Sequence, residues 1–320
     1  MHSRILGTWL ALFVVSCSST MPRESAPPNL TGYTPLVRTS IGLELRLIPP
    51  GSFVMGSSDG PANERPVHEA RISSPYYIGV TEVTQQQFAA FIAETGHVTT
   101  AEKNGGAKVW RQGAWVMDPE ATYRNVFPGA HRPVVAVSFD DAEAFCKWLT
   151  IKERQAGTIS IAAEFRLPTE TEWEYAARAG TNSRWSGTNE IEALCQYANV
   201  PDRSADRAGL GRKFISCDDG VALETAEVAH YRPNAFGLYD MSGNVWEWTQ
   251  DRLGPYSSQT TVDGKGPAAG EERVVRGGSW SGDLHGLHVT HRDGYPPDLR
   301  GGAIGFRVAL IHHGPAATSK

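Results

Sequence analysis

Apolar residues at helical spacing predict three helices, each opened by a hydroxyl side chain that can cap its first turn. The first helix follows Thr84 and ends at Gly96. The second begins at Ser138, and the third follows Thr169 and runs to Gly180. Gln87 and Glu172 complete capping boxes in the first and third helices. The buried stripe of the first helix consists of Phe88, Phe91 and Ile92, and that of the second consists of Phe145, Trp148 and Leu149. The stripe of the third consists of Trp173, Tyr175, Ala176 and Ala177.

The rest of the chain predicts short strands and long loops. Residues 45–55 are typical of two strands interrupted by a Pro-Pro-Gly turn at residues 49–51. The 33 glycines and 20 prolines favour irregular backbone, and nine tryptophans supply bulky anchors for it. We therefore expect an α+β, loop-rich domain. Glu170 and Glu174, at the start of the third helix, are expected to face solvent near the positive end of its dipole.

The first residues are typical of an export signal. Arg4 precedes an apolar run at residues 5–15 that is too short to span a bilayer, so residues 1–16 are predicted to be a signal peptide. The run ends at Val-Val-Ser-Cys17, which resembles a lipobox, so lipidated Cys17 would anchor the chain to a bacterial membrane. Because Ser18 follows, we expect the outer membrane, facing the periplasm. The alternative is a soluble secreted protein, whose cleavage site Val14 fits poorly.

The mature chain is predicted to contain one domain. Residues 17–41 are rich in Ser, Pro and polar residues and form a flexible tether. Residues 42–311 are enough for one large core, and residues 312–320 form a polar tail. The formal charge of −5, without a basic cluster, disfavours nucleic acid as a partner.

Seven segments, in order along the chain, resemble the formylglycine-generating enzyme, or sulfatase-modifying factor, family. This resemblance implies an irregular α+β fold related to C-type lectin-like domains, with a pocket formed late in the sequence. A series of ordered matches is more specific than a single motif. The segments are residues 48–56 (IPPGSFVMG), 64–68 (ERPVH), 133–138 (PVVAVS), 166–180 (RLPTETEWEYAARAG), 234–251 (NAFGLYDMSGNVWEWTQD), 276–280 (RGGSW) and 305–308 (GFRV).

The same resemblance implies two structural calcium ions. Calcium prefers mixed carboxylate, amide and carbonyl oxygens, and it can cross-link loops that lack a strand ladder. The alternative is that the acids of these segments are ordinary turn and surface residues. The first site matches Asn199, the carbonyl of Val200, Asp219 and the carbonyl of Val221, and the second matches Asp240, the carbonyls of Gly243 and Val245, and Glu247.

The four cysteines leave one candidate disulfide. With Cys17 assigned to lipid and Cys146 on an apolar helix face, Cys195 and Cys217 remain to pair in an oxidising compartment. They flank the loop expected to carry the first calcium site. The bond would have a structural role.

The family's oxidases bind copper through two cysteines placed just after the Gly-Gly-Ser motif. Here the aligned positions fall near Gly282 and Leu287, and the last cysteine of the chain is Cys217. Copper(I) prefers sulfur ligands, so hydroxyl or carboxylate groups would not replace the thiolates. The sequence therefore disfavours copper and the oxidation of cysteine to formylglycine, and we expect no catalytic residues of that kind.

Three histidines at intervals of three follow the missing cysteines. In the extended backbone that the family context implies, His285 and His291 would share a face and His288 would lie on the other. Imidazoles bind iron, copper or zinc, so a different metal oxidase is one interpretation; pocket-lining or surface residues are the other. Arg292 is expected to bind an anionic group or to form a salt bridge.

Three functions follow from these observations. The first is a membrane-anchored, calcium-stabilised binding module for an unknown peptide, protein or small-molecule ligand. The second is a divergent metal-dependent oxidoreductase, similar to relatives in pyoverdine maturation or ligated by histidine. The third is true formylglycine generation, which requires thiols that the sequence lacks. The pocket of the binding module would be floored by Trp246, Trp248, Ser279 and Trp280.

Overall fold

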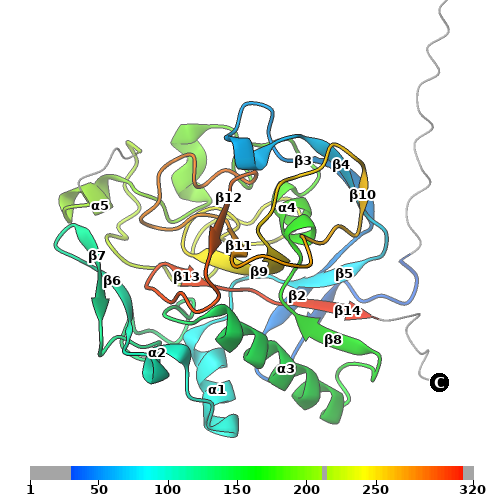
Figure 1. The fold of residues 1–320 in the computed structure, drawn as a ribbon, viewed down its shortest axis with the longest axis horizontal. Helices are drawn as coiled ribbons and strands as arrows, with labels where there is room; N and C mark the ends of the chain where they lie inside the picture. Colours follow the sequence, from blue (N-terminus) through cyan, green and yellow to red (C-terminus); the bar gives the residue numbers. More distant parts are fainter. Residues whose placement is uncertain (1–29, 211–214, 313–320) are drawn as a thin grey trace, which may run out of the picture.

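The computed structural model describes residues 30–210 and 215–312 (Figure 1). The predicted signal peptide, Cys17, the first part of the tether and the tail after residue 312 lie outside the described residues. Within the described part of the chain, no helix has the length and apolar character needed to cross a membrane.

The helices confirm the expectations drawn from capping residues. α1 (Gln85–Thr95), α3 (Phe139–Gln155) and α4 (Glu170–Arg178) each begin after a hydroxyl residue in a complete capping box. Gly96 ends α1 in the left-handed conformation, whereas Ala179 rather than Gly180 takes that position after α4. The shorter helices are η1 (Ala62–Glu64), α2 (Thr100–Lys103), η2 (Ile191–Gln196) and α5 (Arg203–Arg207).

The strands are short and fall into four small sheets, so the α+β prediction is confirmed. The sheet orders are β1-β2-β5-β14-β8, β10-β4-β3, β12-β11-β9-β13 and the hairpin β6-β7. The pairs β10–β4 and β13–β9 are parallel, and the other pairs are antiparallel. The strands are β1 (Leu36–Arg38), β2 (Glu44–Ile48), β3 (Gly51–Met55), β4 (His68–Ile72), β5 (Tyr76–Gly79), β6 (Ala107–Arg111), β7 (Ala114–Asp118), β8 (Ala163–Arg166), β9 (Trp246–Arg252), β10 (Thr261–Val262), β11 (Arg273–Arg276), β12 (Arg292–Tyr295), β13 (Ile304–Gly305) and β14 (Ala309–His312).

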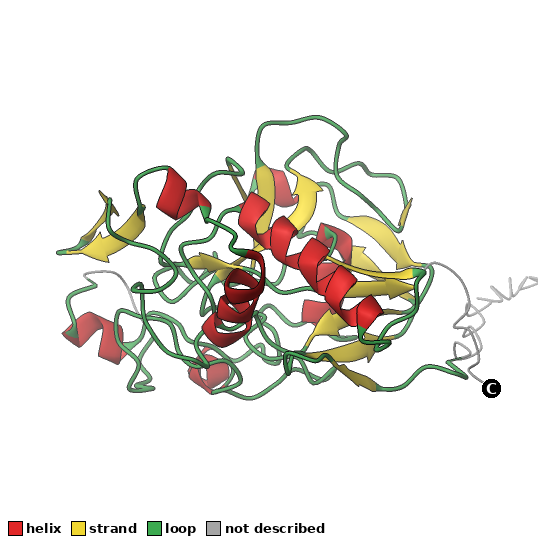
Figure 2. Ribbon diagram, turned by 90° about the horizontal axis from the view of Figure 1, so that it is seen from below, coloured by secondary structure: helices red, strands yellow, loops and turns green. Residues whose placement is uncertain are grey.

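The largest apolar core lies where α1 and α3 meet the sheets. Figure 2 shows these two helices side by side on one face of the molecule. Phe88, Phe145 and Phe306 are fully buried there, and Phe145 and Phe306 pack edge to face with ring centroids 5.4 Å apart. Cys146 is buried on α3, and burial raises the pKa of its thiol. It therefore behaves as a small apolar side chain.

A second core forms around α4, which contacts β3, β4, β9 and β11. Trp173 is fully buried at its centre and donates its indole N–H to Glu247 at 2.8 Å. Since α4 is surrounded on all sides, even its polar residues are buried. α4 thus contacts both the sheet β10-β4-β3 and the sheet β12-β11-β9-β13, which carries several of the late motifs.

Candidate functional site

Residues from two distant parts of the sequence meet at the carboxylate of Glu64, the last residue of η1. One oxygen of this carboxylate, Oε1, lies 3.0 Å from Nε2 of His285 and 3.1 Å from Nδ1 of His291. The other, Oε2, accepts a hydrogen bond of 2.8 Å from the hydroxyl of Thr290. We call Glu64, His285 and His291 the triad.

The histidines come together because their segment forms successive turns. The N–H of His288 donates to the carbonyl of His285, and the N–H of His291 donates to that of His288. The expected extended backbone was therefore wrong. His285 and His291 do face a common partner, but His288 is also close, with its ring 4.7 Å from that of His285 and 5.4 Å from that of Trp185.

Burial and hydrogen bonding act against each other at the triad. Burial favours the protonated form of Glu64, but hydrogen bonds from His291 and Thr290 and the nearby imidazoles outweigh it and hold its pKa at about 2. For His288, burial first and then His285 and Arg184 lower the pKa to about 4. The carboxylate is thus ionised, and His288 is neutral near pH 7.

A cavity of about 650 Å³ opens beside the triad. It is bounded by the loop after β3, by the segment after α4 and by the histidine turns. Arg178 and Arg184 contribute positive charge, and Asp59 contributes one carboxylate. The lining residues are Val54, Gly56, Ser57, Ser58, Asp59, Gly60, Val67, Arg178, Asn182, Ser183, Arg184, Asn189, His285, His288 and Thr290.

The predicted tryptophan pocket is divided by the structure. Trp246 and Ser279 line a second cavity of about 370 Å³, together with Trp115 and Tyr295. Trp248 and Trp280 are fully buried, and the indole N–H of Trp280 donates to the carbonyl of Gly302 at 3.1 Å. The wall of this cavity therefore combines aromatic rings with the hydroxyls of Ser279 and Ser281, and two of the four expected floor residues belong to the core.

The positions of the missing cysteines are accounted for by ordinary packing. Leu287 has no exposed surface and packs in an apolar cluster with Trp185, Leu194 and Val200. Gly282 follows a turn in which its N–H donates to the carbonyl of Ser279. Neither position offers a ligand atom for a metal ion.

Arg292 forms a salt bridge, the second of its two expected roles. Its guanidinium pairs with both oxygens of Glu170 at 2.6 and 2.7 Å and stacks 4.1 Å from the ring of Tyr256. Glu174 is fully buried and binds Arg276 and Arg178. The expectation that Glu170 and Glu174 face solvent was wrong, because α4 is enclosed on all sides.

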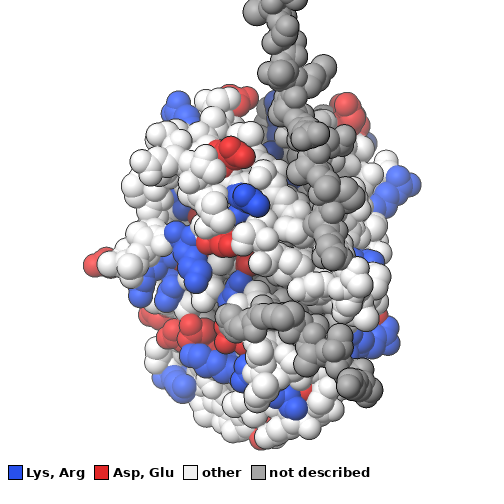
Figure 3. Space-filling view, turned by 90° about the vertical axis from the view of Figure 1, so that its right-hand side faces the viewer, with Lys and Arg blue, Asp and Glu red and all other residues white. Residues whose placement is uncertain are grey.

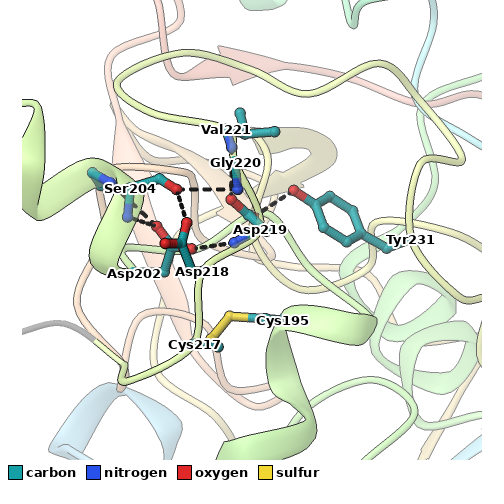
Figure 4. Close-up of a disulfide and its surroundings, with 10 residues drawn as sticks. Cys195, Asp202, Ser204, Cys217, Asp218, Asp219, Gly220, Val221 and Tyr231 are labelled. Carbon is teal, nitrogen blue, oxygen red and sulfur yellow. Dashed lines mark hydrogen bonds between the residues drawn. A yellow bond between two sulfur atoms is a disulfide. The ribbon is translucent and has the colours of Figure 1, made fainter.

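The segment expected to bind the first calcium ion is held by the disulfide Cys195–Cys217, which the structure contains as predicted (Figure 4). Asp219 accepts hydrogen bonds from the hydroxyl of Tyr231 at 2.7 Å and from the N–H of Val221 at 2.8 Å. Burial raises the pKa of Asp219 to about 6. Asn199 is fully buried with its Oδ1 unpaired, as an oxygen reserved for a cation would be. Val200 is buried beside it.

The second expected calcium site contains a concentration of buried acids. Asp240 has one unpaired oxygen, Oδ1, and Glu82, which the sequence did not identify, has another, Oε2. Burial, with Glu247 adding repulsion, raises the pKa of Asp240 to about 6. Glu247 itself forms a bidentate pair with Arg307, both contacts being 2.6 Å. The unpaired oxygens of Asp240 and Glu82 fit a calcium ion, whereas Glu247 is already paired with Arg307.

Sequence reasoning missed Glu64 and Glu82 because neither belongs to the late motifs. Glu64 lies 221 residues before His285, and Glu82 lies 162 residues before Asn244, which donates to it at 2.9 Å. The signal that existed was the match of residues 64–68 to the family. It gave no indication of the partner of Glu64.

Comparisons with known proteins agree with this architecture. The family profile described as "Sulfatase-modifying factor enzyme 1-like domain" matches residues 40–311. The chain is similar to the formylglycine-generating enzyme of Streptomyces coelicolor, with 35% identity over 82% of this chain and 87% of that protein. It is also similar to the mouse "Inactive C-alpha-formylglycine-generating enzyme 2", with 31% identity over 82% and 84% of the two chains.

Two solved structures have folds similar to that of this chain. The variable protein 1 of Treponema denticola has a TM-score of 0.63 and 29% identity, over 87% of this chain and 97% of that one. PvdO from Pseudomonas aeruginosa has a TM-score of 0.65 and 26% identity, over 86% and 97%. Both cover the described domain nearly completely.

Proposed function

Since the chain belongs to the sulfatase-modifying factor family, we propose that it is a membrane-anchored, calcium-stabilised binding module that does not oxidise cysteine to formylglycine. The observation that carries the proposal is that no cysteine follows Cys217 in the chain, and that Leu287, near one of the two expected positions, is fully buried in an apolar cluster. The similarity to a mouse relative described as inactive also supports a chain that does not form formylglycine. Membrane attachment rests on the lipobox resemblance of Cys17.

The second cavity is the proposed ligand site. Trp115, Trp246 and Tyr295 provide flat apolar faces, while Ser279, Ser281 and Lys108 provide hydrogen-bond donors. Pockets of this mixed kind orient a ligand through a few polar groups and derive affinity from aromatic contact. A peptide or a small molecule of similar size is the ligand class that a cavity of about 370 Å³ accommodates.

Calcium would serve the fold in this proposal. The unpaired oxygens of Asn199 and Asp240 would bind it, and the ions would neutralise buried acids and fix the loops around the cavity.

The oxidase question has a direct test. The full chain, purified in detergent and supplied with copper and oxygen, is incubated with a Cys-x-Pro-x-Arg peptide, and aldehyde is trapped with a hydrazide and measured by mass spectrometry. We expect an unchanged peptide and no oxygen uptake above a protein-free control. Aldehyde on the peptide would overturn the proposal.

The binding site has a separate test. A peptide array is incubated with the full chain, with a Trp246→Ala variant and with a Tyr33→Ala variant, which removes a partly buried aromatic side chain that does not line the cavity. We expect a subset of peptides to bind the wild type and the Tyr33 variant and to lose at least tenfold in affinity on Trp246→Ala. Equal binding by all three proteins would exclude the cavity as the site.

The second candidate is a divergent metal-dependent oxidoreductase. The observation that favours it is the contact of Glu64 with His285 and His291, since two imidazoles and one carboxylate are a common ligand set for transition metals. The similarity to PvdO is a likeness of fold only and names no reaction for this chain.

A further inference from the structure

We propose that Glu64, His285 and His291 form a binding site for a divalent first-row transition metal, with its open positions directed at the 650 Å³ cavity. The inference deepens the second candidate function above, on whose contact it rests, and it does not require ligand binding in the tryptophan cavity. One nitrogen of each histidine and one carboxylate oxygen lie within 4.8 Å of one another. This donor set is the 2-His-1-carboxylate arrangement, which leaves positions open for other ligands.

The distances fit a shared metal ion. Two ligand atoms at adjacent corners of an octahedron lie about 3.0 Å apart when each metal–ligand bond is about 2.1 Å, and about 3.4 Å apart in a tetrahedron. The separations from Oε1 of Glu64 to the two imidazole nitrogens are 3.0 and 3.1 Å. The spacing therefore matches neighbouring corners of a six-coordinate site.

The chemistry of Glu64 also requires a cation nearby. Its carboxylate has no exposed surface, and its ion-pair partners within the described residues are the two imidazoles. A buried carboxylate is costly without a positive partner. Some other buried acids of this protein pair with arginine, as Glu174 does with Arg276 and Glu247 does with Arg307. Glu64 faces two metal-binding side chains instead.

The surrounding structure holds the triad in place. Asn63 precedes Glu64, and Arg292 follows His291. The side-chain amide of Asn63 donates to the backbone carbonyl of Arg292 at 2.9 Å. In return, the guanidinium of Arg292 donates to the backbone carbonyl of Asn63 at 3.2 Å. Arg276 donates to the carbonyls of Thr290 and His291. Thr290 holds the second oxygen of Glu64. Outer contacts of this kind orient metal ligands and typically change affinity by about 10- to 100-fold.

The site is accessible from one side. The side chain of His285 is 40% exposed and that of His291 is 17% exposed, while Glu64 closes the base. His285 and Thr290 line the cavity, so a bound ion would present its remaining positions to a small ligand there. A carbon atom added at Gly60 would lie 2.3 Å from Oε2 of Glu64, which shows how closely the loop after β3 covers the carboxylate.

The experiment measures metal binding directly. The full chain, carrying no histidine tag, is freed of metal with chelator, saturated with calcium to occupy the calcium sites, and dialysed against Co²⁺ and, without oxygen, Fe²⁺. Bound metal is counted by mass spectrometry, and the visible absorption of Co²⁺ reports its coordination. We expect one equivalent of either ion and weak Co²⁺ bands typical of six ligands.

Variants connect the ion to the triad. Glu64→Gln, His285→Gln and His291→Gln should each lose at least tenfold in affinity, and Thr290→Val should lose about tenfold. His288→Gln is the matched control, because it removes an imidazole of the same turns without removing a triad ligand. The side chain of His285 is the most exposed of the three, so His285→Gln is the triad variant expected to fold normally. A loss of affinity in this variant therefore reports the loss of a ligand.

Two outcomes would overturn the inference: less than one equivalent bound by the wild type, or affinity unchanged in the three triad variants. Either result would mean that the triad is a proton-bridged ion pair. The peptide array is repeated with the calcium-loaded protein, with and without Co²⁺, so that occupancy of the triad and peptide binding in the tryptophan cavity are measured separately.

Discussion

Replacing Asp240 by asparagine should stabilise the calcium-free protein at neutral pH. Asp240 is 2% exposed, and Glu82 and Glu247 are buried with it, while Arg307 is paired with Glu247 alone. Oδ2 of Asp240 accepts from the N–H of Ala229 at 2.9 Å, and the carboxyl group of Glu82, whose pKa is raised by burial and by Asp240, faces the same side chain. An asparagine keeps the accepted bond, carries no charge and tolerates the positive φ of 60° at this position.

The magnitude follows from the pKa of Asp240, which burial raises from 3.8 to about 6. Between these values the folded chain holds a proton that the unfolded chain has released, so the free energy of unfolding falls as pH rises through this window. A pKa raised by about two units corresponds to a loss of about 3 kcal/mol in the free energy of unfolding. This loss is complete above about pH 6. We expect Asp240→Asn to raise the free energy of unfolding by up to about 3 kcal/mol at pH 7.5 and by almost nothing at pH 4.

Calcium should reproduce the gain in the wild type. An ion at 100 times its dissociation constant stabilises a folded protein by about 2.7 kcal/mol. Because calcium binds the ionised carboxylate, its effect should be larger at pH 7.5 than at pH 5 and smaller in Asp240→Asn than in the wild type.

The assay is urea unfolding followed by tryptophan fluorescence, in chelator and in calcium, from pH 4 to 8. Asp298→Asn, whose side chain is 65% exposed in the wild type, is the control and should change stability by less than about 0.5 kcal/mol. The reasoning fails if Asp240→Asn lowers stability equally at all pH values in chelator, or if calcium stabilises this variant as much as the wild type.

Four further substitutions test the fold, each by the same unfolding measurement in calcium. Phe145→Ala should cost about 3–5 kcal/mol because it opens a cavity in the largest core. Thr169→Ala should cost about 1 kcal/mol through loss of the cap of α4. Cys195→Ser should cost about 3 kcal/mol, and reduction of the wild type should reproduce that loss. Arg307→Met should cost about 3–5 kcal/mol by leaving Glu247 buried and unpaired, with a smaller loss at low pH, where that carboxylate can take up a proton. A loss under about 1 kcal/mol for Phe145 or Arg307 would contradict the packing described here.

The parts of the fold that depend on local rules were predictable. A capping box joins residues three apart, so Thr84, Ser138 and Thr169 marked the helix starts correctly. The disulfide followed from a process of elimination among four cysteines, of which only Cys195 and Cys217 were left to pair. Each of these inferences used information within one segment or a count over the whole chain.

The triad depended on contacts that no local rule describes. The histidine spacing fitted both a strand and a series of turns, and the family context favoured the wrong choice. His285 and His291 were identified as candidates, yet their common partner Glu64 came from the other end of the domain. Side chains at the start of α4 were misplaced for a related reason, since a helix pattern does not show what covers its polar face.

The charge of the surface and that of the interior follow different rules. On the face in Figure 3, groups of Lys and Arg side chains lie directly beside groups of Asp and Glu. Inside the protein, Arg276, Arg292 and Arg307 each pair with a buried glutamate and also donate to loop carbonyls. A loop-rich fold has few strand ladders to satisfy its backbone, and a guanidinium supplies five donors.

These buried arginines distinguish structural charge from the candidate cation sites. Where an arginine is paired with a glutamate, the charge is balanced and the pair holds loops together, so it needs no functional explanation. Glu64 and Asp240 are two of the buried acids that have no arginine partner in the described part of the chain: the first faces two imidazoles, and the second accepts a backbone N–H on one oxygen. A proton or a metal ion would balance either acid, and the atoms around the two carboxylates differ. Nitrogen at Glu64 favours a transition metal, and oxygen around Asp240 favours calcium.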